Sequence, residues 1–148
     1  MINARAESVA TKPSFREAFA RRRCLVPVDG FYEWRREGST KTPFWFHRPD
    51  RDVFALAGIW ERRSAADGGG YGFAILTTDA GPDIADVHDR MPVLVPPAAF
   101  DAWLDRDARA GALEALLRAA PAGTLERHPV SSRVNRTTED DVGLIEPA

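Results

Sequence analysis

Short strand-like segments separated by turn residues set the strongest limit on how this 148-residue chain can fold. The segments are rich in aromatic and β-branched residues, and glycine, proline or aspartate follows most of them. We expect strands at residues 24–28, 31–34, 44–47, 53–61, 71–78, 93–95 and 125–130. The turn Glu37-Gly38-Ser39 joins two of them into a hairpin, and the glycine-rich loop 67–70 joins another two. This order predicts an α+β fold around a mostly antiparallel sheet or open β-barrel.

Helices are expected only at the periphery. The pattern favours short helices at residues 13–19, 97–104 and 112–119, with Thr11 as a cap for the first and a single helical turn at 82–85. Residues 1–148 are long enough for one domain with its own core, and we find no internal repeat.

Composition excludes several classes of protein. Hydrophobic residues make up 44% of the chain, but no apolar run approaches the ~20 residues that a membrane span needs. The N-terminus has no signal-peptide pattern, so we expect a cytoplasmic protein. The single cysteine, Cys24, excludes an internal disulfide framework, and three widely separated histidines do not have the spacing of zinc ligands. We therefore expect no metal and no cofactor.

Charge is unevenly distributed along the chain, although its net value is only -2. Residues 1–63 carry 13 basic and 8 acidic side chains, whereas the remaining residues carry 7 and 14. Such asymmetry indicates a face for an anionic partner, and it is equally typical of charges that are simply solvated.

Glu33 and His88 are the residues best suited to proton transfer. Glu33 lies between Tyr32 and Trp34 on an expected strand, where burial would favour the neutral acid. His88 precedes Asp89, which can orient the imidazole, and Arg90, which can hold a phosphate. Taken singly, each residue is explained as well by a structural role, an edge glutamate or a turn histidine.

Asn3, Arg5 and Glu7 alternate along a segment that we expect to be extended, so that Asn3 and Arg5 share one face. A frayed terminus explains the segment equally well. Cys24 begins an apolar strand, which is typical of an inert buried thiol more than of a nucleophile.

Several longer strings in the chain together resemble one family. They are NARAES, RRCLVPVDGFYEW, FALAGIWE, AILTTDA, VHDRMPVLV and the closing IEP, and they cover nearly the whole chain. The combination closely resembles the SRAP domain, the SOS response-associated peptidase family.

The resemblance implies a function and a set of site residues. SRAP proteins bind single-stranded DNA that contains an abasic site and form a covalent thiazolidine crosslink with it. By motif, Asn3, Glu33 and His88 match the family's catalytic residues. Arg5, Arg90 and Thr78 match residues that contact DNA near the lesion, and Trp34 is an aromatic side chain that could stack on a base. The resemblance also implies a bacterial protein that acts near the nucleoid at sites of damage. The peptidase name refers to removal of the family's own initiator methionine, in which Glu33 is again the expected catalyst.

The start of the chain departs from the family pattern. Members begin Met-Cys-Gly-Arg, whereas this chain begins Met1-Ile2-Asn3, so the resemblance implies that the N-terminal cysteine nucleophile is missing from these residues. Cys24 has no free α-amine and cannot close a thiazolidine. We expect either a sequence that starts too late, a natural truncation, or a separate polypeptide that supplies the segment. Any of these predicts exposed apolar surface and unpaired sheet edges, so we expect the chain alone to be poorly soluble or oligomeric.

Two other functions remain open from the sequence. One is a non-catalytic single-stranded DNA-binding module, an inactive remnant of the family that keeps Arg5, Arg90 and its aromatic platforms. The other is a cysteine hydrolase that uses Cys24 with His88.

Overall fold

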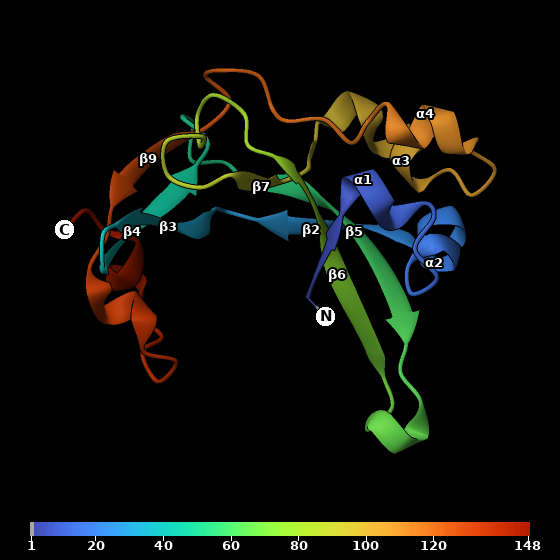
Figure 1. Cartoon of the computed structure of the whole chain (residues 1–148), viewed down its shortest axis with the longest axis horizontal. Coiled ribbons are helices and arrows are strands. Elements are labelled where there is room, and N and C mark those ends of the chain that lie inside the picture. The colour runs from blue at the N-terminus through green and yellow to red at the C-terminus, as the bar shows by residue number, and fades with distance from the viewer. Residues whose placement is uncertain (1) are drawn as a thin grey trace.

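The computed structural model describes residues 2–148, which form two β-sheets with short helices around them (Figure 1). The larger sheet contains β1 (Asn3–Arg5), β6 (Tyr71–Asp79), β5 (Phe54–Arg62) and β2 (Arg23–Val28) in that order, with β7 (Arg90–Pro92) on β6 and β8 (Leu94–Val95) on β5. The smaller sheet has the order β3 (Phe31–Glu37), β4 (Thr40–His47), β9 (Glu126–Pro129). Neither sheet closes into a barrel.

Among the described strands, all pairings but one are antiparallel. The exception is β1, which runs parallel to β6 with Asn3 opposite Ile75 and Arg5 opposite Thr77. This places the start of the chain beside the middle of β6, and it ties down a terminus that could otherwise fray.

The helices are short. They are α1 (Ala6–Val9), α2 (Arg16–Arg21), α3 (Phe100–Leu104) and α4 (Ala110–Glu114), with 3₁₀ turns at η1 (Ala65–Asp67), η2 (Pro97–Ala99), η3 (Ser132–Asn135) and η4 (Val142–Ile145). Figure 1 shows α1 to α4 gathered at the end of the molecule away from the C-terminal segment, while the β5–β6 hairpin extends away from both. None of the helices in residues 2–148 is long and apolar enough to cross a membrane.

One side of the larger sheet, the helix-covered face, packs against these helices. Alternate residues of β5 and β6 point to this face, where Ala57, Ile59, Ala74 and Leu76 are buried with Trp103 of α3. Arg23, 7% exposed, extends across it and donates hydrogen bonds to main-chain carbonyls of α2, of α3 and of the residue that follows α3. The helices are therefore fixed to the sheet by both apolar packing and a buried cation.

The opposite side, the site face, carries the intervening residues Gly58, Trp60, Phe73, Ile75 and Thr77. Near β8 it packs against the smaller sheet in a second apolar cluster, in which the rings of Phe31 and Phe46 stack at 5.4 Å. Toward the tip of the β5–β6 hairpin this packing ends, and Tyr71 and Phe73 are exposed.

The structure confirms the expected fold class and the strand series, but it corrects several local expectations. Glu7 lies in α1, so the extended segment ends at Arg5. Thr11 does not cap the next helix, because α2 begins at Arg16 and the Thr11 hydroxyl donates to the Ser8 carbonyl. Residues 82–85 form hydrogen-bonded turns without an assigned helix, and the last helix is shorter than predicted.

Candidate functional site

A cavity of about 260 Å³ lies where the two sheets meet. Its walls come from β1, β3, β6, β7 and the turn between β6 and β7, and they are Asn3, Ala4, Arg5, Glu33, Thr77, His88, Arg90 and Met91. Asn3, Glu33 and His88 are far apart in sequence, and the fold brings all three to this cavity.

Glu33 supplies the carboxylate from β3, where it pairs with Phe44 of β4. Its side chain is 23% exposed. Burial raises the pKa of Glu33 above its ordinary value, and the nearby His88 opposes this shift only in part. A carboxyl group in this setting is suited to hold and release a proton closer to neutral pH than an exposed glutamate.

His88 supplies the imidazole from the turn that precedes β7. Its Nε2 lies 3.9 Å from Oε2 of Glu33, a distance at which a small shift or a substrate atom can complete the contact. Nδ1 faces the turn, where it lies 3.0 Å from the main-chain nitrogen of Arg90, 3.1 Å from the Arg90 carbonyl and 3.3 Å from Asp89 Oδ1. The turn therefore holds the ring with Nε2 directed toward Glu33.

Asn3 and Arg5 reach the cavity from β1. They are exposed, whereas Ala4 between them is 2% exposed and packs on the helix-covered face. The strand alternation thus puts an amide and a guanidinium on the same side, as the sequence predicted. Arg5 forms no ion pair with any of the described residues, so its charge is open to an anion.

Arg90 also lines the cavity, but its surroundings differ from those of Arg5. Its side chain is 14% exposed and pairs with Glu7 and Asp79. The contact of Arg90 with DNA stays a prediction, and the structure adds two carboxylates that the sequence analysis had not connected to it.

Thr78 and Trp34 lie outside this cavity. Thr78 is 8% exposed, and its neighbour Thr77 lines the cavity in its place. Trp34 points away from Glu33, as strand alternation requires, and its indole N–H donates to Asn135 at 2.8 Å. Their contacts with DNA remain predictions, and Thr77, not the predicted Thr78, is the threonine that lines the cavity.

Cys24 lies on β2, at the far edge of the larger sheet from β1, and is not among the residues that line the cavity. A Cβ added to Gly58 would lie 2.8 Å from the Cys24 Sγ, so the thiol sits close against the neighbouring strand. Burial raises the pKa of Cys24, which is the opposite of what a reactive thiolate needs. Within residues 2–148, no group of three His, Cys, Asp or Glu side chains is arranged to bind a metal.

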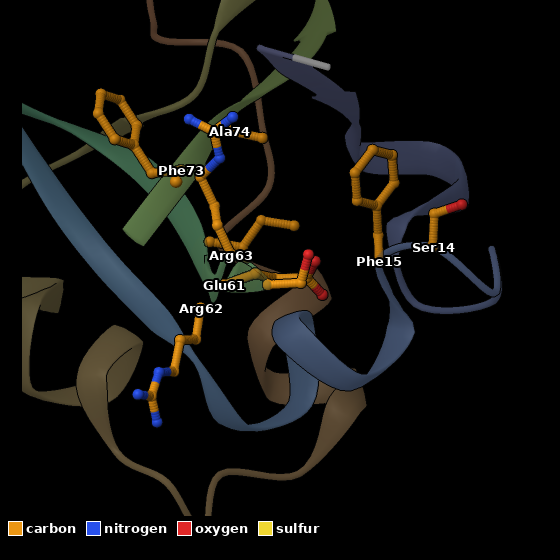
Figure 2. Close-up of a pocket in the computed structure, with 10 residues that line it drawn as sticks. Ser14, Phe15, Glu61, Arg62, Arg63, Phe73 and Ala74 are labelled. Carbon is orange, nitrogen blue, oxygen red and sulfur yellow. The ribbon is translucent and has the colours of Figure 1, made fainter. Parts of the chain in front are cut away.

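A larger cavity, about 630 Å³, lies toward the β5–β6 hairpin. Figure 2 shows Phe15 and Phe73 on opposite sides of it, with Glu61 and Arg63 between them and Arg62 pointing away. Its walls contain no histidine and only one carboxylate, Glu61, which is paired with Arg22. Because the groups capable of proton transfer converge in the smaller cavity, we consider that cavity the candidate site.

Comparison with known proteins identifies the family of the chain. The chain matches the family model described as SOS response associated peptidase (SRAP) over residues 1–137, and it belongs to that family. The family predicted from the sequence is therefore confirmed.

The relatives carry names that refer to a DNA lesion. The chain is 38% identical over 99% of its length to the protein named abasic site processing protein YoqW of Bacillus subtilis, and 32% identical over 99% to abasic site processing protein YedK of Escherichia coli. A crystal structure of a protein from Bacteroides thetaiotaomicron aligns over 99% of the chain with a TM-score of 0.88 and 29% identity.

The chain spans about two thirds of the length of these proteins: 66% of the Bacillus protein, 67% of the E. coli protein and 65% of the Bacteroides chain.

Proposed function

We propose that this chain carries the acid–base part of a site that processes abasic sites in single-stranded DNA. The observation that carries the proposal is the Glu33–His88 pair, in a cavity that Asn3 and Arg5 also line. An abasic deoxyribose opens to an aldehyde, and both its opening and its capture need positioned proton donors. Membership of the SRAP family supports a DNA lesion as the substrate.

The proposed chemistry uses an N-terminal cysteine from a segment outside these 148 residues. Its α-amine bonds to the aldehyde carbon, and loss of water gives an imine. The thiol then adds to the imine carbon while a proton passes to nitrogen, which closes a thiazolidine ring. The same Glu33 would assist the hydrolysis that removes the initiator methionine and so exposes that cysteine.

Each side chain has a role in this scheme. Glu33 protonates the departing hydroxyl during imine formation, which its raised pKa supports. His88 exchanges a proton with the sugar ring oxygen through Nε2, and Asn3 orients the sugar. Arg5 binds a backbone phosphate, since it is exposed and not engaged by a carboxylate of the described residues.

Binding is the first test. We expect the chain to bind a single-stranded oligonucleotide with a tetrahydrofuran abasic analogue more tightly than the intact strand. Arg5→Gln should weaken binding to both strands alike and reduce the slope of affinity against salt by about one phosphate contact. Equal affinity of the wild-type chain for the two strands would contradict the proposal.

A second experiment tests the covalent step. A peptide that begins Cys-Gly-Arg would be mixed with single-stranded DNA bearing a natural abasic site, with and without the protein. We expect faster formation of the heat-stable peptide–DNA adduct with wild type than with Glu33→Gln, while the two proteins bind the analogue equally. An identical rate of adduct formation with both proteins would show that Glu33 does not catalyse the reaction.

A non-catalytic single-stranded DNA-binding module is the second candidate. The position of Cys24, half-buried and away from the cavity, favours it over a cysteine hydrolase. This function predicts salt-sensitive binding to DNA without any acceleration of adduct formation.

A further inference from the structure

Arg90 is almost completely engaged by its neighbours. Nη1 donates to Glu7 Oε1 at 2.8 Å and to Asp79 Oδ1 at 2.6 Å. Nη2 donates to Glu7 Oε2 at 2.9 Å and to the Thr77 carbonyl at 2.7 Å. All four Nη hydrogens therefore have acceptors, and Nε is buried.

The Glu7–Arg90 pair has the parallel two-bond geometry that makes guanidinium–carboxylate contacts both strong and directional. The Arg90 guanidinium holds the pKa of Glu7 below its ordinary value, so the carboxylate stays charged at neutral pH. Glu7 itself is half-exposed and does not line the cavity. Its hydrogen bonds to the site go to Arg90, and the charge of the nearby Arg5 also lowers its pKa.

This pair adds a side-chain connection between two parts of the site that are otherwise joined through β6 and through apolar packing. Glu7 is in α1, which follows directly after β1, the strand that carries Asn3. Because β1 has three residues, its parallel pairing with β6 supplies few hydrogen bonds. On the other side, the main-chain N–H of Arg90 fixes Nδ1 of His88. One residue thus reaches from the Asn3 strand to the His88 ring.

We infer that Glu7 is a positioning residue of this site, which acts through Arg90 to hold the Asn3 strand and the His88 turn in their relative places. The inference rests on the proposed function and deepens it, because it gives a role to a carboxylate outside the cavity. The simplest alternative predicts the opposite effect of removing Glu7 on DNA binding. If Glu7 only competed with a phosphate for Arg90, its removal would tighten DNA binding and steepen the salt dependence.

The test compares Glu7→Gln with the matched control Glu17→Gln, measured on the 148-residue chain well below its melting temperature. Glu17 is an exposed helical glutamate that pairs with Arg22 at 2.7 Å, away from the cavity. We expect Glu7→Gln to lose about tenfold of the preference for the tetrahydrofuran strand over the intact strand, with an unchanged salt slope. Glu17→Gln should keep the preference.

A double-mutant cycle tests whether Glu7 acts through Arg90. Because Glu7 acts through Arg90, adding Glu7→Gln to Arg90→Gln should lower the preference no further. Additive losses, an unchanged preference in Glu7→Gln, or tighter binding with a steeper salt slope would each overturn the inference.

Amide hydrogen exchange tests the same inference in the absence of DNA. Glu7→Gln should speed amide exchange at residues 3–5 and 88–90 and leave β2 unchanged, and Glu17→Gln should alter neither region. Uniformly faster exchange across the larger sheet, or no change at residues 3–5, would overturn it. A wild-type chain without preference for the abasic strand would refute the proposed function, while the exchange measurement would still decide the role of Glu7.

Discussion

The two faces of the larger sheet use the same strands for different purposes. On the helix-covered face, Arg23 is surrounded by carbonyl oxygens of α2, α3 and the residue after α3, and apolar residues fill the rest. On the site face, charged side chains meet one another around a cavity, and apolar residues remain exposed at the hairpin. The comparison teaches that the helix-covered face serves packing, whereas the site face combines apolar packing near β8 with groups whose burial costs stability.

Arg23→Met should give the largest effect, because it removes the cation that bonds the carbonyls of two helices on the helix-covered face. We expect the free energy of unfolding to fall by about 3 kcal/mol in urea denaturation, since buried carbonyls lose their partner. Arg21→Met, at an exposed position in α2, should change it by less than about 0.5 kcal/mol. Similar losses for both would contradict the assigned role of Arg23.

Gly58→Ala tests how tightly β5 and β2 approach on the site face. The new Cβ would lie 2.8 Å from the Cys24 Sγ and 2.9 Å from a Val26 methyl, so we expect a loss of about 1–2 kcal/mol in the free energy of unfolding.

The double variant Gly58→Ala/Cys24→Ala should recover part of that loss in the same denaturation experiment. Cys24→Ala by itself should leave DNA binding unchanged. If Cys24→Ala abolished adduct formation with the Cys-Gly-Arg peptide, the Cys24 thiol would take part in the reaction and its role would not be only structural.

Glu33→Gln should stabilise the protein at neutral pH by roughly 0.5–1 kcal/mol, because it removes a carboxylate whose charge is costly to bury. Since the folded-state pKa of Glu33 is raised, the folded state binds more protons than the unfolded state just above the ordinary value of 4.5. Stability from this group is therefore present below pH 4.5 and lost as pH rises through the folded pKa.

Thermal melts across that pH range check the sign. The wild-type melting temperature should fall relative to that of Glu33→Gln as pH rises from 4.5 through the folded pKa of Glu33. Parallel curves for the two proteins would contradict the raised pKa.

Tyr71→Lys should have the smallest effect on folding. Tyr71 and Phe73 are 72% and 57% exposed on the site face, so replacing Tyr71 should change the free energy of unfolding by less than about 0.5 kcal/mol. It should nevertheless reduce concentration-dependent self-association in sedimentation velocity, because exposed aromatic surface promotes contact between copies. Unchanged self-association would direct attention to other exposed apolar residues, such as Val53.

The sequence predicted most of the antiparallel strands, because each of them has its own pattern of aromatic and β-branched residues and is bounded by turn residues. It also pointed to Asn3, Glu33 and His88, which the fold brings to one cavity. It did not predict α1, because four residues are too few for helical periodicity to be recognised.

The surroundings of Arg90 were missed for a different reason. Its partners Glu7 and Asp79 lie 83 and 11 residues away, and only the tertiary fold brings them together. Likewise, whether Thr77 or Thr78 faces the cavity depends on the register of β6, which the local sequence does not determine.

The parallel pairing of β1 with β6 has a consequence for when the site comes into existence. Asn3 finds its place opposite Ile75 only after the chain has been made through β6, and His88 follows later still. Parallel pairing across such a separation is slow to form, and it contributes stabilising free energy only late in folding. A nascent or partly folded chain would therefore hold Asn3 and His88 apart, and the cavity that they line would form only once the tertiary structure is complete.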